Sequence, residues 1–180
     1  MVRLLNESKN LEEIRLLNED ENLFNAKTRY RSRTIYNAVS SRINAIPHEL
    51  IIFFGKTDIS TQKLIAVTAV MTAESLFFDF MYEVYREKLI LGEKTLTPSD
   101  FFQFFENKKM QDERIASWTD PTLDRLSRAY RNVLLKSNLI KLIKKKEWAV
   151  EKPVINRQFA ELMQRSKMSA FYSALSGGDK

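Results

Sequence analysis

The sequence contains no cysteine, and this absence removes several classes of site at once. A chain without Cys has no disulfide, no thiolate zinc site, no iron–sulfur cluster and no cysteine nucleophile. His48 is the only histidine, so metal sites built from several histidines are excluded and a Ser-His-Asp triad is disfavoured. We therefore expect no catalytic, metal-binding or cofactor-binding residues and no bound cofactor.

Glycine and proline are also scarce, with 4 of each among 180 residues. So few glycines, spread over distant positions, cannot form a glycine-rich phosphate loop. The scarcity of both residues disfavours an all-β fold, which needs many tight turns. Hydrophobic residues make up 44% of the chain, enough to bury a core. The sequence predicts an all-α protein, a compact multi-helix domain with helix-turn-helix-like elements and one small β-hairpin.

A long hydrophobic run is missing as well. A membrane span needs about 20 mostly apolar residues, and the longest apolar stretch, from Leu64 to Phe78, is shorter and contains Glu74. The residues from Met1 to Glu7 lack the apolar segment and cleavage site of a secretory signal. We expect a cytoplasmic protein without a membrane partner.

Basic and acidic residues are separated along the chain, although the net charge is only +6. Residues 1–25 carry a net charge of −3, and residues 46–120 carry −4. Residues 26–45 carry +5, and residues 121–180 carry +8. Two basic blocks separated by an acidic one indicate an anionic partner. The alternative is that these side chains only solvate exposed helix faces.

Apolar spacing predicts helices through most of the first 95 residues. Asn10 is in position to cap the first of them. The expected helices span Leu11–Asp20, Thr28–Ala45, Glu49–Gly55 and 61–91. The last is apolar on most sides, as buried helices are, and is either one helix or two that meet near Thr72–Ser75. We assign residues 1–95 to an N-terminal helical subdomain.

Large hydrophobic side chains supply the predicted core. From the apolar helical region we expect burial of Leu64, Val67, Leu76, Phe77, Phe80 and Val84. From the region that follows we expect further core anchors at Phe101, Phe102, Phe104 and Phe105. Aromatic residues in such numbers are more typical of a core or interface than of a cofactor site.

Two helices in the second half begin with the same pattern of a capping residue followed by proline. Thr97-Pro98 starts one helix, and Thr119-Asp120-Pro121 starts another that runs to about Ser137. A short helix near residues 112–118 separates them. The apolar runs within residues 139–151 then predict a hairpin with Lys144-Lys145-Lys146 at its tip.

A last helix is expected from Asn156 to Arg165, with the terminal residues forming a tail. We assign residues 96–168 to a winged-helix-like C-terminal subdomain and residues 169–180 to the tail. The order of helix, short helix, longer helix and basic hairpin is typical of a winged helix-turn-helix. In that module the third helix enters the major groove of DNA, and the hairpin contacts the backbone or the minor groove.

Two groups of basic residues are the candidate nucleic-acid-binding sites. In the helix after Pro121, the basic residues lie opposite the apolar stripe at about 100° per residue. In the earlier helix they are spread over two flanks. The first surface consists of Arg29, Arg31, Arg33 and Arg42, and the second consists of Arg125, Arg128, Lys136, Lys144, Lys145 and Lys146.

Asp79, Glu83 and Glu87 lie four residues apart on one helix face. Paired carboxylates can bind Mg²⁺ or transfer protons. No nucleotide-binding loop, histidine or second carboxylate motif accompanies them in the sequence. We interpret them as partners of nearby Lys or Arg side chains, and we predict that the protein is not an enzyme.

Several segments are similar to one family. They are Glu21-Asn22-Leu23-Phe24, Thr28-Arg29 through Ser41-Arg42-Ile43, Lys63-Leu64-Ile65, Phe78-Asp79-Phe80 with Glu83-Val84-Tyr85-Arg86-Glu87-Lys88, Leu96-Thr97-Pro98-Ser99-Asp100, Trp118-Thr119-Asp120-Pro121-Thr122 and Leu135 to Ile140. Together they resemble BrxA, a family of small accessory proteins of bacterial BREX phage-defence systems. The resemblance spans residues 10–165.

This resemblance implies a compact all-helical fold with helix-turn-helix-like elements, comparable to the NusB antitermination fold. It also implies a non-enzymatic accessory role in phage defence that involves binding of double-stranded DNA, with other BREX proteins as further partners. Two alternatives remain open. The basic surfaces could serve a protein adaptor that meets an acidic partner, or, by the comparison with NusB, they could bind RNA.

Overall fold

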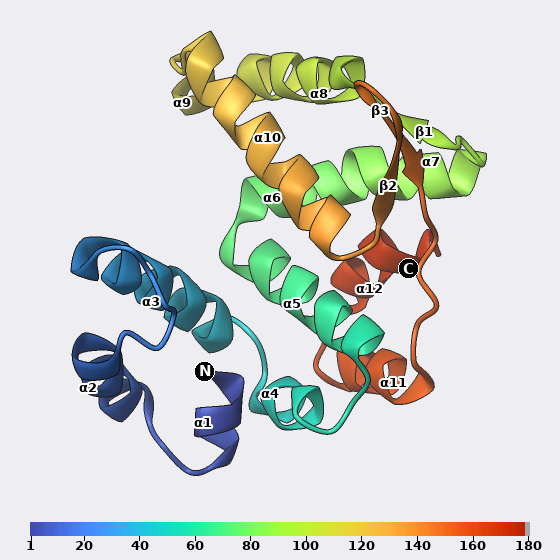
Figure 1. Cartoon of the computed structure of the whole chain (residues 1–180). Helices are drawn as coiled ribbons and strands as arrows, with labels where there is room; N and C mark the ends of the chain where they lie inside the picture. The colour runs from blue at the N-terminus through green and yellow to red at the C-terminus, as the bar shows by residue number, and fades with distance from the viewer. Residues whose placement is uncertain (179–180) are drawn as a thin grey trace. The chain divides into compact units, whose positions relative to one another are not determined.

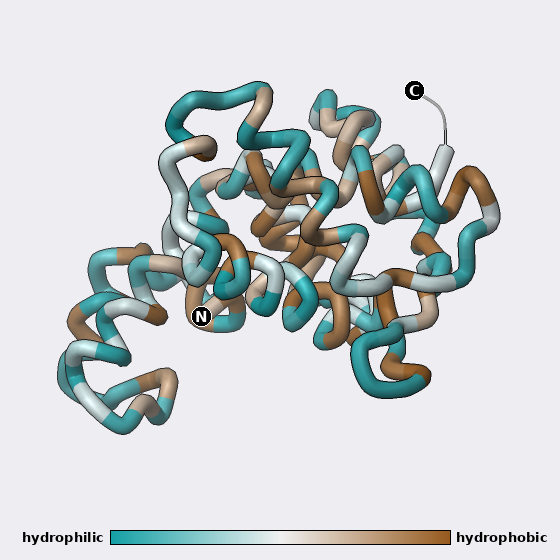
Figure 2. Tube along the Cα trace, turned by 90° about the horizontal axis from the view of Figure 1, so that it is seen from above, coloured by the Kyte–Doolittle hydropathy of each residue, from teal (hydrophilic) through white to brown (hydrophobic). Residues whose placement is uncertain are grey.

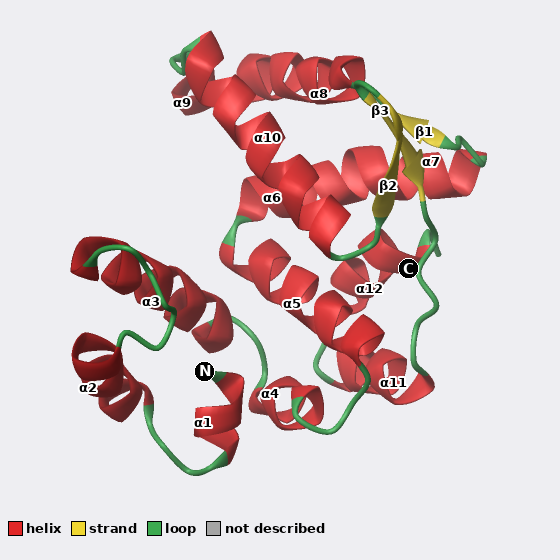
Figure 3. Ribbon diagram, in the orientation of Figure 1, coloured by secondary structure: helices red, strands yellow, loops and turns green. Residues whose placement is uncertain are grey.

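The computed structural model describes residues 1–178 and places more than half of them in helices (Figure 3). Two compact units are formed, Met1–Ala73 and the chain from Glu74 onward. The division differs from the predicted boundary after residue 95. Phe80 and Tyr85, which precede that boundary, pack against later residues of the second unit.

The first unit is entirely helical within its described residues (Figure 1). Its helices are α1 (Val2–Asn6), α2 (Leu11–Glu21), α3 (Arg29–Asn44), α4 (His48–Phe54) and α5 (Ile59–Ala73). The predicted cap of α2 is confirmed, because the Asn10 side chain accepts a hydrogen bond from the Glu13 backbone N–H and the Glu13 carboxylate accepts one from the Asn10 N–H. Helix α1 has no counterpart among the predicted elements.

Helices α2 and α3 pack together through a buried polar contact and an apolar one. The Ser32 hydroxyl donates to the amide oxygen of Asn18 at 2.8 Å, and both residues are buried. The Tyr36 hydroxyl donates to the backbone oxygen of Leu11 at 2.6 Å. Ile14 is completely buried. These contacts commit one side of α3 to the interior and leave its other sides to solvent.

The second unit contains shorter helices, a π-helical turn and a small sheet. Its helices are α6 (Ser75–Phe80), η1 (Met81–Tyr85, π-helical), α7 (Arg86–Leu91), α8 (Pro98–Gln111), α9 (Glu113–Ala116), α10 (Asp120–Lys136), α11 (Arg157–Arg165) and α12 (Ser169–Ser176). Its strands are β1 (Thr95–Leu96), β2 (Ile140–Lys144) and β3 (Glu147–Val150). Hydrophobic and hydrophilic residues alternate along the helical trace (Figure 2).

The long apolar region is interrupted at Glu74, so it forms separate helices. Glu74 has an extended backbone at the start of α6 and its side chain is exposed. Of the predicted core residues in this region, Leu76 and Val84 are only half-buried. No single helix within residues 1–178 is long and apolar enough to cross a membrane, and α5 with residues 75–91 reaches that length and composition only across the break.

Aromatic rings form much of the core of the second unit. Phe80 is completely buried, stacks on Phe101 with ring centroids 4.8 Å apart, and lies 5.5 Å from the ring of Tyr130. Burial raises the pKa of the Tyr130 hydroxyl above its ordinary value. Phe102 was predicted as a core residue, but 66% of it is exposed. It falls on the outer side of α8, away from Phe101 and Phe105.

The predicted hairpin is confirmed, and it belongs to a three-stranded antiparallel sheet with the order β1-β3-β2. The extra strand, β1, lies before α8 and pairs Leu96 with Trp148. Both side chains are buried. The additional strand covers the edge of β3 that does not pair with β2.

The predicted tail also differs from the structure. Residues 169–176 form α12, and Ala174 and Leu175 are completely buried. Gly177 has a left-handed backbone (φ 72°) and ends this helix. Asp179 and Lys180 lie outside the described residues. Helix α12 packs against η1, α7 and α11, and this packing buries Ala174 and Leu175.

The carboxylates of Asp79 and Glu83 bind a lysine from another helix. Lys108 of α8 is only 7% exposed, and its ammonium lies 2.9 Å from Asp79 and 2.6 Å from Glu83. Burial lowers the pKa of Lys108, but hydrogen bonds to Glu83 and Asp79 outweigh it, so the pKa is raised above its ordinary value. These carboxylates therefore hold α8 against the helical region before it, and their partner comes from another helix rather than from a neighbouring position in the sequence.

Replacing Lys108 with Met should lower the free energy of unfolding by roughly 1.5–3 kcal/mol, because charged hydrogen bonds to two carboxylates are lost. Urea denaturation followed by circular dichroism measures this change. Lys94 is exposed, and its replacement with Met should change stability by less than about 0.5 kcal/mol. Equal urea midpoints for the two variants would show that the ion pairs of Lys108 with Asp79 and Glu83 do not stabilise the fold.

Candidate nucleic-acid interface

The second unit has the order of elements on which the sequence-based expectation of a winged helix-turn-helix rests. Helices α8, α9 and α10 are followed by the hairpin of β2 and β3. The Asp112 side chain caps α9 by accepting a hydrogen bond from the Arg114 backbone N–H at 2.8 Å. Pro121 lies in the first turn of α10, as the sequence predicts. This arrangement positions α10 as the helix that follows the turn.

Helix α10 has one buried side and one charged side. Leu123, Tyr130 and Leu134 are buried. These residues recur at helical spacing, so the opposite side of the helix faces outward. The predicted site residues on this helix are all exposed: Arg125, Arg128 and Lys136. At 1.5 Å per residue, the distance from Arg125 to Lys136 along the axis is about 16 Å.

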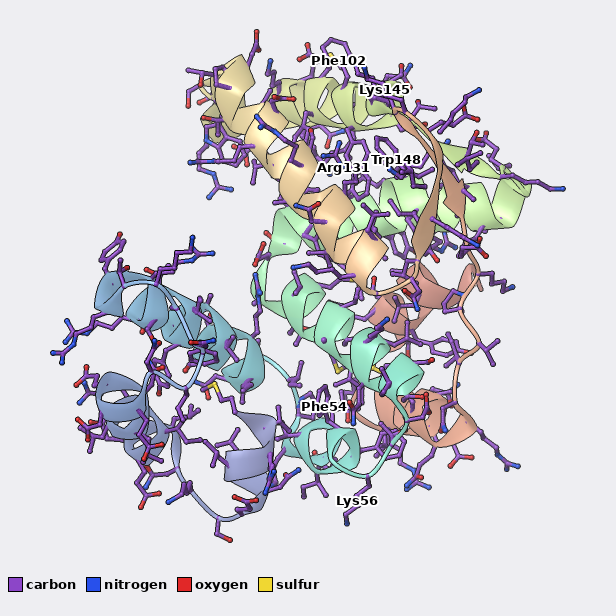
Figure 4. The ribbon with its side chains drawn as sticks, in the orientation of Figure 1. Phe54, Lys56, Phe102, Arg131, Lys145 and Trp148 are labelled. Atoms are coloured by element: carbon purple, nitrogen blue, oxygen red, sulfur yellow. The ribbon has the colours of Figure 1, made fainter. Side chains whose placement is uncertain are left out.

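The hairpin tip carries the three predicted lysines on a tight connection. Lys144 pairs with Glu147 in the strand register, leaving Lys145 and Lys146 as the turn. Lys146 has a left-handed backbone with φ of 65°. All three lysines are exposed, and Figure 4 shows Lys145 projecting from the tip.

A cation–π contact joins the hairpin to α10. The guanidinium carbon of Arg131 lies 5.1 Å from the centre of the Trp148 ring (Figure 4). Trp148 also meets Phe101 of α8 edge-on at 6.5 Å. These contacts hold β3 against α8 and α10. Arg131 is not among the predicted site residues, because no local pattern pairs it with a residue 17 positions away.

A cleft of about 640 Å³ lies between α8, α10 and the hairpin. Arg128, Arg131 and Lys146 line it together, so a basic residue of α10 and one of the tip border the same space. Glu106, Asp120 and Asp124 line it as well. The cleft is therefore mixed in charge, while the outer face of α10 around Arg125 and Asn132 forms a separate shallow hollow.

A cation that already pairs with a carboxylate is less available to a new anionic partner than a cation without such a pair. Arg128 binds Asp124 at 2.8 Å, although both side chains are more than half exposed. Lys144 binds Glu147 at 2.8 Å, and this hydrogen bond raises the pKa of the lysine. Within residues 1–178, no ion pair involves Arg125, Lys136, Lys145 or Lys146. These four are therefore the predicted site residues of the second unit that can accept an anionic partner without breaking an ion pair.

The other predicted basic surface lies on α3 in the first unit. Arg29, Arg31 and Arg33 are exposed, whereas Arg42 is half-buried. Arg33 lies 3.5 Å from Glu19, which also binds Arg15 at 2.9 Å. The basic residues of α3 are thus partly engaged by the acidic helix α2, and only the start of α3 presents unpaired arginines.

Metal-binding geometry gives no additional site. Within residues 1–178, there is no group of three or more His, Asp or Glu side chains that could hold a metal ion. The acidic pair that the sequence raised as a candidate, Asp79 and Glu83, is occupied by Lys108. The basic face of α10 and the hairpin tip are the strongest candidate site on the second unit.

Comparison with known proteins agrees with the sequence resemblance. A family model described as BrxA matches residues 1–167. The BREX protein BrxA of Bacillus cereus (strain H3081.97) is 35% identical over 158 residues, which are 88% of this chain and 78% of that protein. The crystal structure of an uncharacterized protein from Magnetospirillum magneticum matches 98% of this chain and 90% of its own, with a TM-score of 0.81 and 16% identity. At that identity the likeness concerns the fold alone.

Proposed function

The chain belongs to the BrxA family of BREX phage-defence proteins, and from this premise we propose that it is a non-enzymatic accessory protein that binds duplex DNA. The observation that supports the proposal most is the placement of the free cations. Arg125, Lys136, Lys145 and Lys146 lie on the two elements that a winged helix-turn-helix presents to DNA.

The proposed contact is with the phosphate backbone. Arginine and lysine without acidic neighbours neutralise phosphates and release counterions, which supplies affinity without sequence information. The exposed face of α10 offers cations about 16 Å apart, a span that covers several phosphates at one charge per 1.7 Å of duplex. Recognition on this model is largely independent of sequence.

The basic start of α3 is proposed as a second, weaker contact. Arg29 and Arg31 are exposed, and within residues 1–178 no ion pair involves them. Arg33 shares Glu19 with Arg15, which reduces its availability. Since duplex DNA of an invading phage is reached inside the cell, we infer that the protein acts in the cytoplasm.

Neutralising the hairpin tip tests this proposal. Lys144 and Lys145 are changed to Gln, and Lys146 is changed to Asn, because Asn tolerates the left-handed backbone at that position. The log–log slope of affinity against salt should flatten by about one to three units. Fluorescence anisotropy with a duplex of mixed sequence, at several salt concentrations, measures the slope.

The fold should survive these changes because all three side chains are exposed. An unchanged melting temperature serves as the control. If the variant retains both the affinity and the salt slope of the wild type, the hairpin tip does not contact DNA. If the wild type binds an acidic protein or RNA but no duplex DNA, the basic surfaces serve one of the alternative partners.

A further inference from the structure

Two large aliphatic side chains are exposed next to the basic tip of the hairpin. Leu142 is 60% exposed and Ile143 is 55% exposed. They are consecutive residues of β2, and exposed lysines adjoin them on both sides, at 141 and 144. An isolated exposed Leu is ordinary, but an adjacent aliphatic pair enclosed by lysines on a protruding hairpin requires an explanation.

The strand register shows why these side chains are not covered. Leu142 lies opposite Trp148, so it is on the side of the sheet that packs against the helices. Trp148 is only 5% exposed, whereas Leu142 is 60% exposed although it lies directly opposite Trp148. The pairing is irregular between Leu142 and Lys144, so Ile143 is an extra residue without a partner on β3. Such irregularities redirect side chains and increase the local twist.

The charge around this pair indicates the kind of partner that would cover it. Lys141, Lys145 and Lys146 are exposed cations that flank the two aliphatic residues along the chain, and Lys144 adds a fourth that pairs with Glu147. An apolar surface enclosed by cations is complementary to an apolar slot enclosed by anions. The minor groove of duplex DNA has this form, because phosphates flank a base step that an aliphatic side chain can enter.

We propose that Leu142 and Ile143 form an apolar wedge that enters the minor groove and bends the duplex. This inference rests on the proposed function, since it assigns a second role to the hairpin that the lysines bring to DNA. The lysines hold the phosphates, and the aliphatic pair partly unstacks one base step. Pyrimidine–purine steps unstack most readily, so the wedge favours TA and CA/TG steps at the site of insertion.

The test replaces both aliphatic residues with Ser in the full chain. A duplex of about 30 base pairs (three helical turns) with a central TA step and a fluorophore at each end reports bending by energy transfer, and anisotropy reports affinity. The wild type should shorten the end-to-end distance. L142S/I143S should abolish that change and bind roughly 10-fold more weakly, because buried apolar area is lost. The salt slope should stay the same, since no charge is removed.

Val154 provides a matched control. It is 92% exposed and lies outside the hairpin, so V154S makes the same kind of change at another surface. V154S should bind and bend the duplex as the wild type does. Both variants should melt near the wild-type temperature, because exposed side chains contribute little to stability.

The outcomes separate the two proposals. If the wild type binds duplex DNA with a steep salt slope but does not bend it, or if L142S/I143S binds and bends it normally, the wedge is wrong and DNA binding stands. If the wild type binds no duplex DNA at low salt, both are overturned. If anionic phospholipid vesicles bind the wild type and not L142S/I143S, while bending is absent, the pair contacts lipid rather than a groove.

Discussion

Replacing Phe80 with Ala should lower the free energy of unfolding by about 3–5 kcal/mol. Phe80 is completely buried and contacts three aromatic rings, those of Phe101 at 4.8 Å, Phe104 at 5.2 Å and Tyr130 at 5.5 Å. Truncation removes the apolar surface that Phe80 buries. It also leaves a cavity, because the surrounding rings relax only partly. Denaturation in urea, monitored by circular dichroism, measures the loss.

Phe102 is the matched control, since it is the same residue type in the same unit but is 66% exposed. F102A should change the free energy of unfolding by about 0.5 kcal/mol or less. A change of that size in F80A would contradict the aromatic core described for the second unit. A large loss in F102A would show that this ring is covered in the folded protein.

Removing the four cations of α10 and the hairpin tip that have no ion pair should nearly abolish DNA binding. The variant carries R125Q, K136Q, K145Q and K146N. If each cation neutralises one phosphate, the log–log salt slope should flatten by about 3–4 units, and affinity near 0.1 M salt should fall on the order of 1,000-fold. The two halves, R125Q/K136Q and K145Q/K146N, should each account for about half of the slope change.

The loss of net charge needs its own control. Arg157 and Arg165 are exposed cations on α11, outside the motif. R157Q/R165Q removes as much charge as either half of the quadruple variant. It should leave the slope nearly unchanged, because a phosphate must be close to release its counterions. An equal effect from both pairs would show that binding depends on overall charge and not on α10 and the hairpin.

The sequence predicted the elements whose signals are local. The proline at the second position of α10 and the capping box of α8 fixed the start of both helices, and structure confirms them. The exposure of Arg125, Arg128 and Lys136 followed from helical periodicity alone, since the opposite side of α10 is apolar. The hairpin followed from its apolar runs and its charged tip.

Features that depend on distant pairing were not predicted. Strand β1 has only two residues, and its partner strand lies about 50 positions later in the chain. The contact of Arg131 with Trp148 and the burial of Lys108 depend on packing between elements. Burial of α12 depends on packing as well. No local propensity encodes such contacts, so they cannot be assigned from the sequence alone.

The exposure of Phe102 differs from the prediction, although helical periodicity accounts for it. Phe102 was grouped with the neighbouring core aromatics, although helical spacing separates it from Phe101 by about 100° and puts Phe101 and Phe105 on a common side. Its exposure is therefore a consequence of periodicity. The predicted availability of Lys144 is a different case, because its ion pair with Glu147 depends on the register of the hairpin.

The central claim, binding of duplex DNA through backbone phosphates, is tested most directly by one titration of the wild-type protein. Fluorescence anisotropy of a labelled duplex is measured at several salt concentrations, with single-stranded RNA of equal length as the comparison. The account predicts binding at low salt that weakens with a log–log slope of about −0.9 for each phosphate neutralised, and tighter binding to the duplex than to RNA. Absence of duplex binding at the lowest salt concentration would contradict it.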